Sequence, residues 1–241
     1  MPAAGRLSFA TSVFSVDVDG VAAHCNPVVC VISGIRGAVS VIGGGERVTG
    51  DVVLIRPGVE HRVECRGSGI NAMYLDGLAW PLARTGGAPL AQRLSGGLGD
   101  LALAAIFQKG EAQDELRRRL AVDAPACPQS LATVIEELAS DPMARMSQLE
   151  LSNRLQMERT AALRLFKAVT GQTFRGFKQW SGLQHAARQI AAGELVRTAA
   201  LDAGFADTAH LTRTFRLSFG LTPSEAIRGL AKAAPSGGSG F

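Results

Sequence analysis

Imidazoles and thiols are the side chains in the N-terminal half whose chemistry could serve a binding site. They are His24, Cys25, Cys30, His61 and Cys65. Such groups can bind a transition metal, so a metal- or thiol-responsive site is one interpretation. The alternative is structural, because buried cysteines commonly behave as small hydrophobic residues. With Cys127 the chain has four cysteines and no C-x-x-C pair, which indicates reduced thiols and no disulfide framework.

Basic and hydrogen-bonding residues recur in the C-terminal half in a repeated pattern. The pattern R-x-F-[KR]-x3-G-x-T begins at Arg164 and begins again at Arg213, an offset of 49 residues. Self-similarity of this kind indicates that one supersecondary unit occurs twice.

The second copy has the features of a helix-turn-helix. Thr198–Leu201 can form a short helix, Gly204 can supply the turn, and Asp207 can cap the next helix. At 100° per residue, that helix has an apolar back and a front formed by Ala209, His210, Thr212, Arg213 and Arg216. Arginine, threonine and histidine are suited to contact bases or phosphates in a major groove. The segment Thr222–Glu225 is a capping box that starts a last helix.

The first copy follows this pattern less closely. A support helix over 146–155 would lead to a turn at Gln156, where glycine is expected, and to a second helix over 159–170 capped by Glu158. We therefore expect this copy to contribute less sequence information to DNA binding. The stretch 174–192 is predicted to form one long helix that joins the copies and could place both recognition helices in successive major grooves, ~34 Å apart.

Short apolar runs separated by glycine predict an all-β structure for the first ~80 residues. The predicted strands are 28–33, 38–42, 52–55 and 70–75, with a further strand opening at His61. Helices are predicted over 101–108 and 111–120, followed by a proline-containing linker at 122–129 and a helix capped by Ser130.

The C-terminal half resembles the AraC/XylS family of transcription regulators, almost residue by residue over Ala203–Glu225. The family implies two helix-turn-helix subdomains joined by a helix. The predicted DNA-binding residues are Thr160, Leu163, Arg164, Lys167, Thr208, Ala209, His210, Thr212, Arg213 and Arg216. Two departures from the family pattern are Gln156 for the turn glycine and Gly182 for an arginine of the linker helix.

The segment Gly50–His61 resembles the cupin motif G-D-x-x-x-I-x-P-G-x-x-H. The resemblance implies a β-barrel sensor domain, often binding a small effector, followed by helices that dimerise. The predicted ligand-binding residues are His24, Cys30, His61 and Cys65. A metal enzyme is disfavoured because the His-x-His pair and the glutamate of metal-binding cupins are missing. A regulator that responds to a ligand and a constitutive architectural DNA binder both remain open.

The chain of 241 residues is therefore predicted to be an α+β protein of two domains: a cupin-like β-barrel with trailing helices, then an all-α domain with two helix-turn-helix subdomains and a linker helix. The predicted divisions are 7–88 (sensor), 89–121 (dimerisation), 122–129 (linker), 130–232 (DNA-binding) and 233–241 (disordered tail).

Charge and hydropathy suit this division. Residues 1–129 contain 12 basic and 12 acidic residues, whereas residues 130–241 contain 13 and 9, so the net charge of +4 lies in the C-terminal half. Apolar runs are shorter than the ~18 residues of a membrane span, and no signal peptide is evident, so we expect a cytoplasmic protein. The expected partners are double-stranded DNA, a small-molecule effector and a second copy of the chain, with RNA polymerase as a further candidate. We expect no membrane partner, no cofactor and no enzymatic activity.

Overall fold

A computed structural model describes residues 11–78, 89–108, 110–120, 127–141, 143–144 and 146–233. The predicted linker at 122–129 lies mostly outside the described residues, and so does the predicted tail from residue 234 onward. The predicted domain boundaries remain predictions.

The N-terminal half forms two antiparallel sheets. The described strands are β1 (Thr11–Val16), β2 (Gly20–Cys25), β3 (Val29–Gly34), β4 (Val39–Gly43), β5 (Glu46–Gly50), β6 (Val52–Ile55), β7 (Glu60–Glu64), β8 (Ile70–Leu75) and β9 (Ala91–Arg93). A five-stranded sheet has the order β1-β8-β3-β6-β9, and a four-stranded sheet has the order β2-β7-β4-β5. Along β7, His61 and Val63 are buried and alternate with exposed Arg62, as in a strand with one covered face.

The two sheets face each other across a shared apolar core. Ile32 and Ile55 of the five-stranded sheet belong to the same cluster of buried residues as Val41 and Val63 of the four-stranded sheet. Among the described strands, hydrogen bonds do not join the two sheets into one closed barrel. The predicted fold class, an α+β chain with a β-sheet half followed by an all-α half with two helix-turn-helix subdomains, is confirmed.

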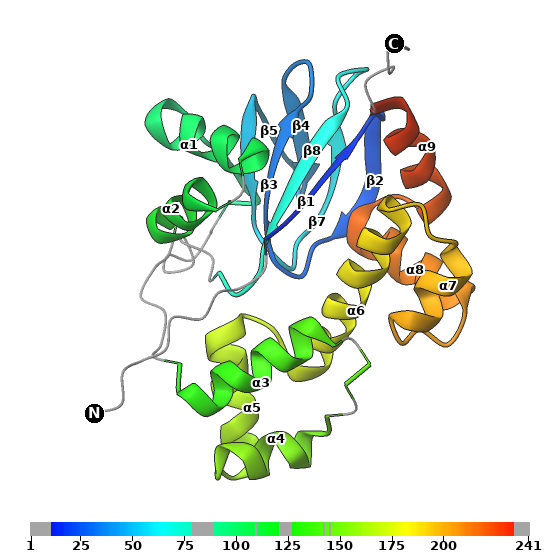
Figure 1. The fold of residues 1–241 in the computed structure, drawn as a ribbon. Helices are drawn as coiled ribbons and strands as arrows, with labels where there is room; N and C mark the ends of the chain where they lie inside the picture. Colours follow the sequence, from blue (N-terminus) through cyan, green and yellow to red (C-terminus); the bar gives the residue numbers. More distant parts are fainter. Residues whose placement is uncertain are drawn as a thin grey trace, which may run out of the picture.

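Two helices cover the outer face of the five-stranded sheet (Figure 1). They are α1 (Gly96–Phe107) and α2 (Glu111–Leu120). Ala102, Ala105 and Leu116 are fully buried against Val31 and Leu54, which point to this side of the sheet. Nearly every residue of β3 and β6 is buried, because both faces of these strands are covered.

The first helical subdomain has a core of its own. It comprises α3 (Gln129–Ser140), α4 (Gln148–Leu155), α5 (Arg159–Thr170) and the first turns of α6 (Phe174–Ala191). Phe166 is fully buried at its centre, with edge-on ring contacts to Phe174 and Phe177 at centroid distances of 5.3 and 5.4 Å.

The second helical subdomain shares its core with the two sheets. It comprises the rest of α6 with α7 (Val196–Asp202), α8 (Thr208–Phe219) and α9 (Pro223–Ala233). Helices α8 and α9 lie beside β2 and β1 (Figure 1). The Phe219 ring lies 6.2 Å from Phe14 and 5.4 Å from Tyr74, centroid to centroid. The Ala22 amide donates to the Gly220 carbonyl at 3.0 Å. This docking differs from the sequence-based prediction, which treated the two halves as separate.

None of the described helices is long and apolar enough to cross a membrane.

Candidate DNA interface and interdomain cavity

Helices α7 and α8 form a helix-turn-helix whose turns and caps are those predicted. Gly204 has a φ of 77° in the turn, and Gly220 ends α8 with a φ of 72°. A residue with a Cβ is strained in this left-handed region, which explains glycine at both positions. Asp207 caps α8 by accepting a hydrogen bond from the His210 amide at 2.6 Å.

The front of α8 is open to solvent. Thr208, Ala209, Arg213 and Arg216 are exposed, and His210 and Thr212 are half-buried. The back is anchored by Leu211 and Phe215, which are buried in the shared core. This amphipathic arrangement leaves the polar face available to a DNA groove.

A capping box starts α9 directly behind α8. The Thr222 amide donates to Glu225 Oε2 at 2.7 Å, and the Glu225 amide donates to Thr222 Oγ1 at 3.2 Å. The bonds that the Thr222 amide and hydroxyl donate to the carboxylate lower the pKa of Glu225.

Helices α4 and α5 form the first helix-turn-helix with less favourable turn chemistry. Gln156 has a φ of 51°, a conformation that costs an ordinary L-residue roughly 1–2 kcal/mol. Glu158 caps α5 by accepting from the Thr160 and Ala161 amides at 2.7 and 3.1 Å, and these bonds lower its pKa.

The outward face of α5 carries three of its four predicted contact residues in exposed positions, namely Thr160, Arg164 and Lys167. Leu163 is half-buried and packs against the core of the first subdomain. Both recognition helices therefore present their predicted basic residues to solvent.

The absence of an arginine at position 182 has a steric reason. A Cβ on Gly182 would lie 2.6 Å from the Ala203 carbonyl oxygen, at the end of α7. The close approach of α7 to α6 thus leaves no room for a side chain there.

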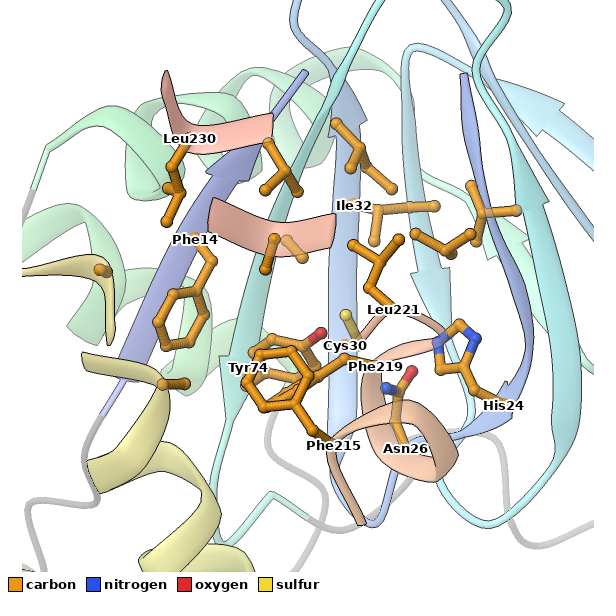
Figure 2. A pocket seen from close by; sticks show the side chains of 18 of the residues that line it. Phe14, His24, Asn26, Cys30, Ile32, Tyr74, Phe215, Phe219, Leu221 and Leu230 are labelled. Carbon is orange, nitrogen blue, oxygen red and sulfur yellow. The ribbon is translucent and has the colours of Figure 1, made fainter. Parts of the chain in front are cut away.

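A cavity of about 70 Å³ lies where the second subdomain meets the two sheets (Figure 2). Its walls include Ile32 and Tyr74 from the five-stranded sheet, His24 from the four-stranded sheet, and Phe215 and Phe219 from α8. Residues of α6 and α9 complete the lining. The walls are mostly apolar, and the polar groups His24 and Asn26 lie together at one end (Figure 2).

Asn26 connects this polar end to the recognition helix. Its Nδ2 donates to the Ser218 carbonyl near the end of α8 at 2.7 Å. Its Oδ1 is buried and has no hydrogen-bond partner. The side chain was not singled out in the sequence, where Asn26-Pro27 indicates only a turn.

The His24 and His61 rings are in contact, with centroids 4.4 Å apart and planes tilted by 55°. The Nδ1 atoms lie 2.8 Å from the Ala22 and Val59 carbonyls respectively, so each Nδ1 carries the proton and each Nε2 is an acceptor. Burial, and secondly the neighbouring His61, lower the pKa of His24 to about 4, and burial lowers that of His61. Both rings are therefore neutral at pH 7.

Two of the four predicted ligand-binding residues, His24 and Cys30, line this cavity. His61 lies behind His24 and is not part of the lining, and Cys65 lies elsewhere, with its Sγ donating to the Val18 carbonyl at 2.9 Å. Burial raises the pKa of both thiols, that of Cys65 to about 11, so neither is a reactive thiolate. The described residues include no group of three histidines, cysteines or carboxylates placed to hold a metal ion.

A buried carboxylate links the end of β8 to α6. Trp180 Nε1 donates to Asp76 Oδ1 at 2.7 Å, and Gln184 Nε2 donates to both carboxylate oxygens at 3.1 and 3.2 Å. Arg117 of α2 donates to the Asp76 carbonyl at 2.7 Å. Asp76 thus joins the sheet, α2 and the linker helix.

Comparison with known proteins agrees with this arrangement. A family model described as a helix-turn-helix domain, of the AraC type, matches residues 151–229. Residues 151–229 thus carry a helix-turn-helix domain of the AraC type. The match covers α5 and α8 and most of the helices around them. This domain is of the kind through which transcription regulators bind DNA.

Solved structures similar over the whole chain come from ToxT of Vibrio cholerae. ToxT of strain O395 bound to (E)-4-(8-methylnaphthalen-1-yl)but-3-enoic acid has a TM-score of 0.59 at 9% identity, over 92% of this chain and 100% of that chain. Fatty-acid-bound ToxT of strain SCE256 has a TM-score of 0.54 at 12% identity, over 94% and 97%. This likeness shows a shared fold. A comparison with curated protein sequences gives no match.

Proposed function

We propose that this AraC-type regulator responds to a small molecule bound in the interdomain cavity. The observation that carries the proposal is the composition of the wall, to which both sheets and helices α6, α8 and α9 contribute. A ligand there contacts the sensor half and the second helix-turn-helix at once. The ToxT structures with small molecules bound support the idea that this fold accepts such ligands.

The small size of the cavity couples ligand entry to the position of α8. A cavity of ~150 Å³ holds benzene, and this one measures about 70 Å³. A ligand of benzene size therefore enters only if a wall moves. The sheets are held by continuous hydrogen-bonded ladders, whereas α8 and α9 are joined to them by few hydrogen bonds. Binding should therefore shift the second subdomain relative to the first and change DNA affinity.

On the DNA side, we propose that α5 and α8 read sequence in successive major grooves. Arg213 and Arg216 would carry most of the readout on α8, with Thr208, Ala209, His210 and Thr212 beside them. Arg164 and Lys167 would contact DNA from α5 together with Thr160, while Leu163 mainly supports the helix.

We also propose a homodimer built on α1 and α2. Phe107 is 69% exposed at the end of α1, and Leu101 and Leu103 are half-buried on the same helix. This apolar surface exceeds what the sheet below it covers, and a second copy of the chain would bury it.

Filling the cavity tests the proposed coupling without knowledge of the effector. Operator fragments are first selected from genomic DNA with the wild-type chain. Ala72 lines the cavity from β8, so Ala72→Leu should occupy most of the space. Overpacking costs about 1–3 kcal/mol. If displacement of α8 relieves it, the Kd for the operator should change by about tenfold.

Ala23→Leu is the matched control, because Ala23 is exposed on β2 outside the cavity. Its Kd for the operator should stay at the wild-type value. Equal Kd values for both variants would favour an architectural DNA binder with a purely structural sensor half.

A further inference from the structure

We propose that the cavity selects a neutral, apolar molecule that donates a hydrogen bond, such as an alkylphenol, and rejects carboxylates. This inference rests on the proposed function and names the chemical class of its effector. The class differs from the carboxylic acids seen in the ToxT structures.

The lining carries no charge that could offset an anion. The side chains around the cavity include no lysine, arginine, aspartate or glutamate. Burial keeps the pKa of His24 low, so this ring is neutral. Tyr74 can offer one neutral hydroxyl. A carboxylate without a cationic partner loses several kcal/mol of hydration on burial, which one hydroxyl does not replace.

The polar end of the cavity presents acceptors. The donation from Asn26 Nδ2 to the Ser218 carbonyl fixes the orientation of the amide and leaves Oδ1 buried without a donor. Figure 2 shows Asn26 beside His24, with its oxygen on the Leu221 side. His24 adds Nε2 as a second acceptor, because its Nδ1 proton is used on the Ala22 carbonyl. An unsatisfied buried acceptor is stabilised by a ligand that brings a donor.

The end of helix α8 strengthens this preference. Phe219 and Leu221, on either side of the C-cap Gly220, both line the cavity. The carbonyl end of a helix carries a partial negative charge, which opposes an anion and favours a donor. A protonated amine would also donate, but it would be buried without a carboxylate partner, at a similar cost to that of an unpaired anion.

Three ligands of one shape test the inference on the full-length chain. They are 4-propylphenol, which is neutral and donates; 4-propylanisole, which is neutral and cannot donate; and 4-propylbenzoate, which is an anion at pH 7.5. Isothermal titration calorimetry should give 4-propylphenol a Kd about tenfold below that of 4-propylanisole. The benzoate should bind at least about a hundredfold more weakly than the phenol.

Asn26→Leu should abolish the preference for phenol over anisole while the cavity still binds both. Asn71→Leu is the control, since Asn71 is another buried asparagine but lies outside the cavity lining. It should keep the wild-type preference. If Asn26→Leu does not fold, the ligand series on the wild-type chain decides alone.

The outcomes distinguish the inferred ligand class from the proposed role of the cavity as an effector site. Benzoate or anisole binding as tightly as phenol overturns the inferred class and leaves an effector cavity in place. Failure of all three ligands to bind overturns the cavity as an effector site and the inferred class with it.

Discussion

Arg213 occupies the centre of the exposed face of α8, one helical turn before the apolar C-terminal end that docks on the sheets. Its neighbours on that face are short or polar, so a long guanidinium can reach a base edge unobstructed. We expect Arg213→Ala to weaken operator binding by about 1–3 kcal/mol and to relax specificity at one base pair. Arg164→Ala should cost less, because α5 follows a strained turn. Competition binding with single-base operator variants measures both effects.

Arg62→Ala serves as the control for loss of a positive charge, because Arg62 is exposed on β7, far along the chain from either recognition helix. It should leave operator affinity unchanged. An equal loss of affinity for operator and random DNA in Arg213→Ala would show that this residue binds phosphate and does not read bases.

Residue-level chemistry that depends on local geometry could be predicted from the sequence. The caps Asp207 and Glu158 and the glycines Gly204 and Gly220 are examples, because each acts within one turn of the chain. Asn26 could not be predicted, because its unpaired Oδ1 matters only once α8 docks 192 residues away in sequence.

At the scale of helices and strands, Asp76 connects the end of β8 to α6. Burial raises its pKa from 3.8 to about 6, against the opposing effects of Trp180, Arg117, Gln184 and Arg188. Since the folded pKa exceeds the unfolded one, the protonated carboxyl stabilises the fold fully below pH ~4, and this contribution is lost as the pH rises through ~6. The free energy of unfolding of the wild type, minus that of Asp76→Asn, should fall by about 1–3 kcal/mol over this range.

Denaturant unfolding at a series of pH values measures this difference. Taking the difference between two chains removes the titration of groups such as Glu158 and Glu225, whose lowered pKa acts in the opposite direction. A flat difference for Asp76→Asn would mean that the carboxyl titrates equally in the folded and unfolded chain.

Elements with strong apolar patterns were predicted well, and weakly patterned ones were not. Strands β3, β4, β6 and β8 lie within a residue or two of their predicted ranges, because each is a short, mostly apolar run. Strand β5 has mostly exposed residues, and β9 has only three residues at a sheet edge, so neither carries a clear periodic signal. The predicted start of α1 is five residues too late. The first turn of this helix is Gly96-Gly97-Leu98-Gly99, and glycine has a low helix propensity.

At the scale of the whole molecule, the two helix-turn-helix subdomains differ in whether their core residues pack only among their own helices or also against the sheets. The first buries Phe166 and Leu131 among its own helices. The second buries Phe219 against Phe14 and Tyr74 of the sensor half. The two subdomains have similar sequences, but only the second depends on the sheets to bury its core residues. Sequence similarity could not predict this difference, because it arises from tertiary contacts.

This asymmetry predicts how a truncated chain should behave. A fragment of residues 127–241 keeps the whole core of the first subdomain but exposes Phe219 and removes the hydrogen bond to the Gly220 carbonyl. Exposure of a buried aromatic side chain costs roughly 1.5–3 kcal/mol. Amide hydrogens of α8 should therefore exchange at least about tenfold faster in the fragment than in the full chain, whereas those of α5 should change little. Hydrogen exchange read out by NMR resolves both helices in one sample, so α5 is the internal control.

Equal acceleration of exchange in α5 and α8 would mean that the fragment is destabilised as a unit. Unchanged exchange in α8 would mean that docking on the sheets contributes nothing to the stability of this helix.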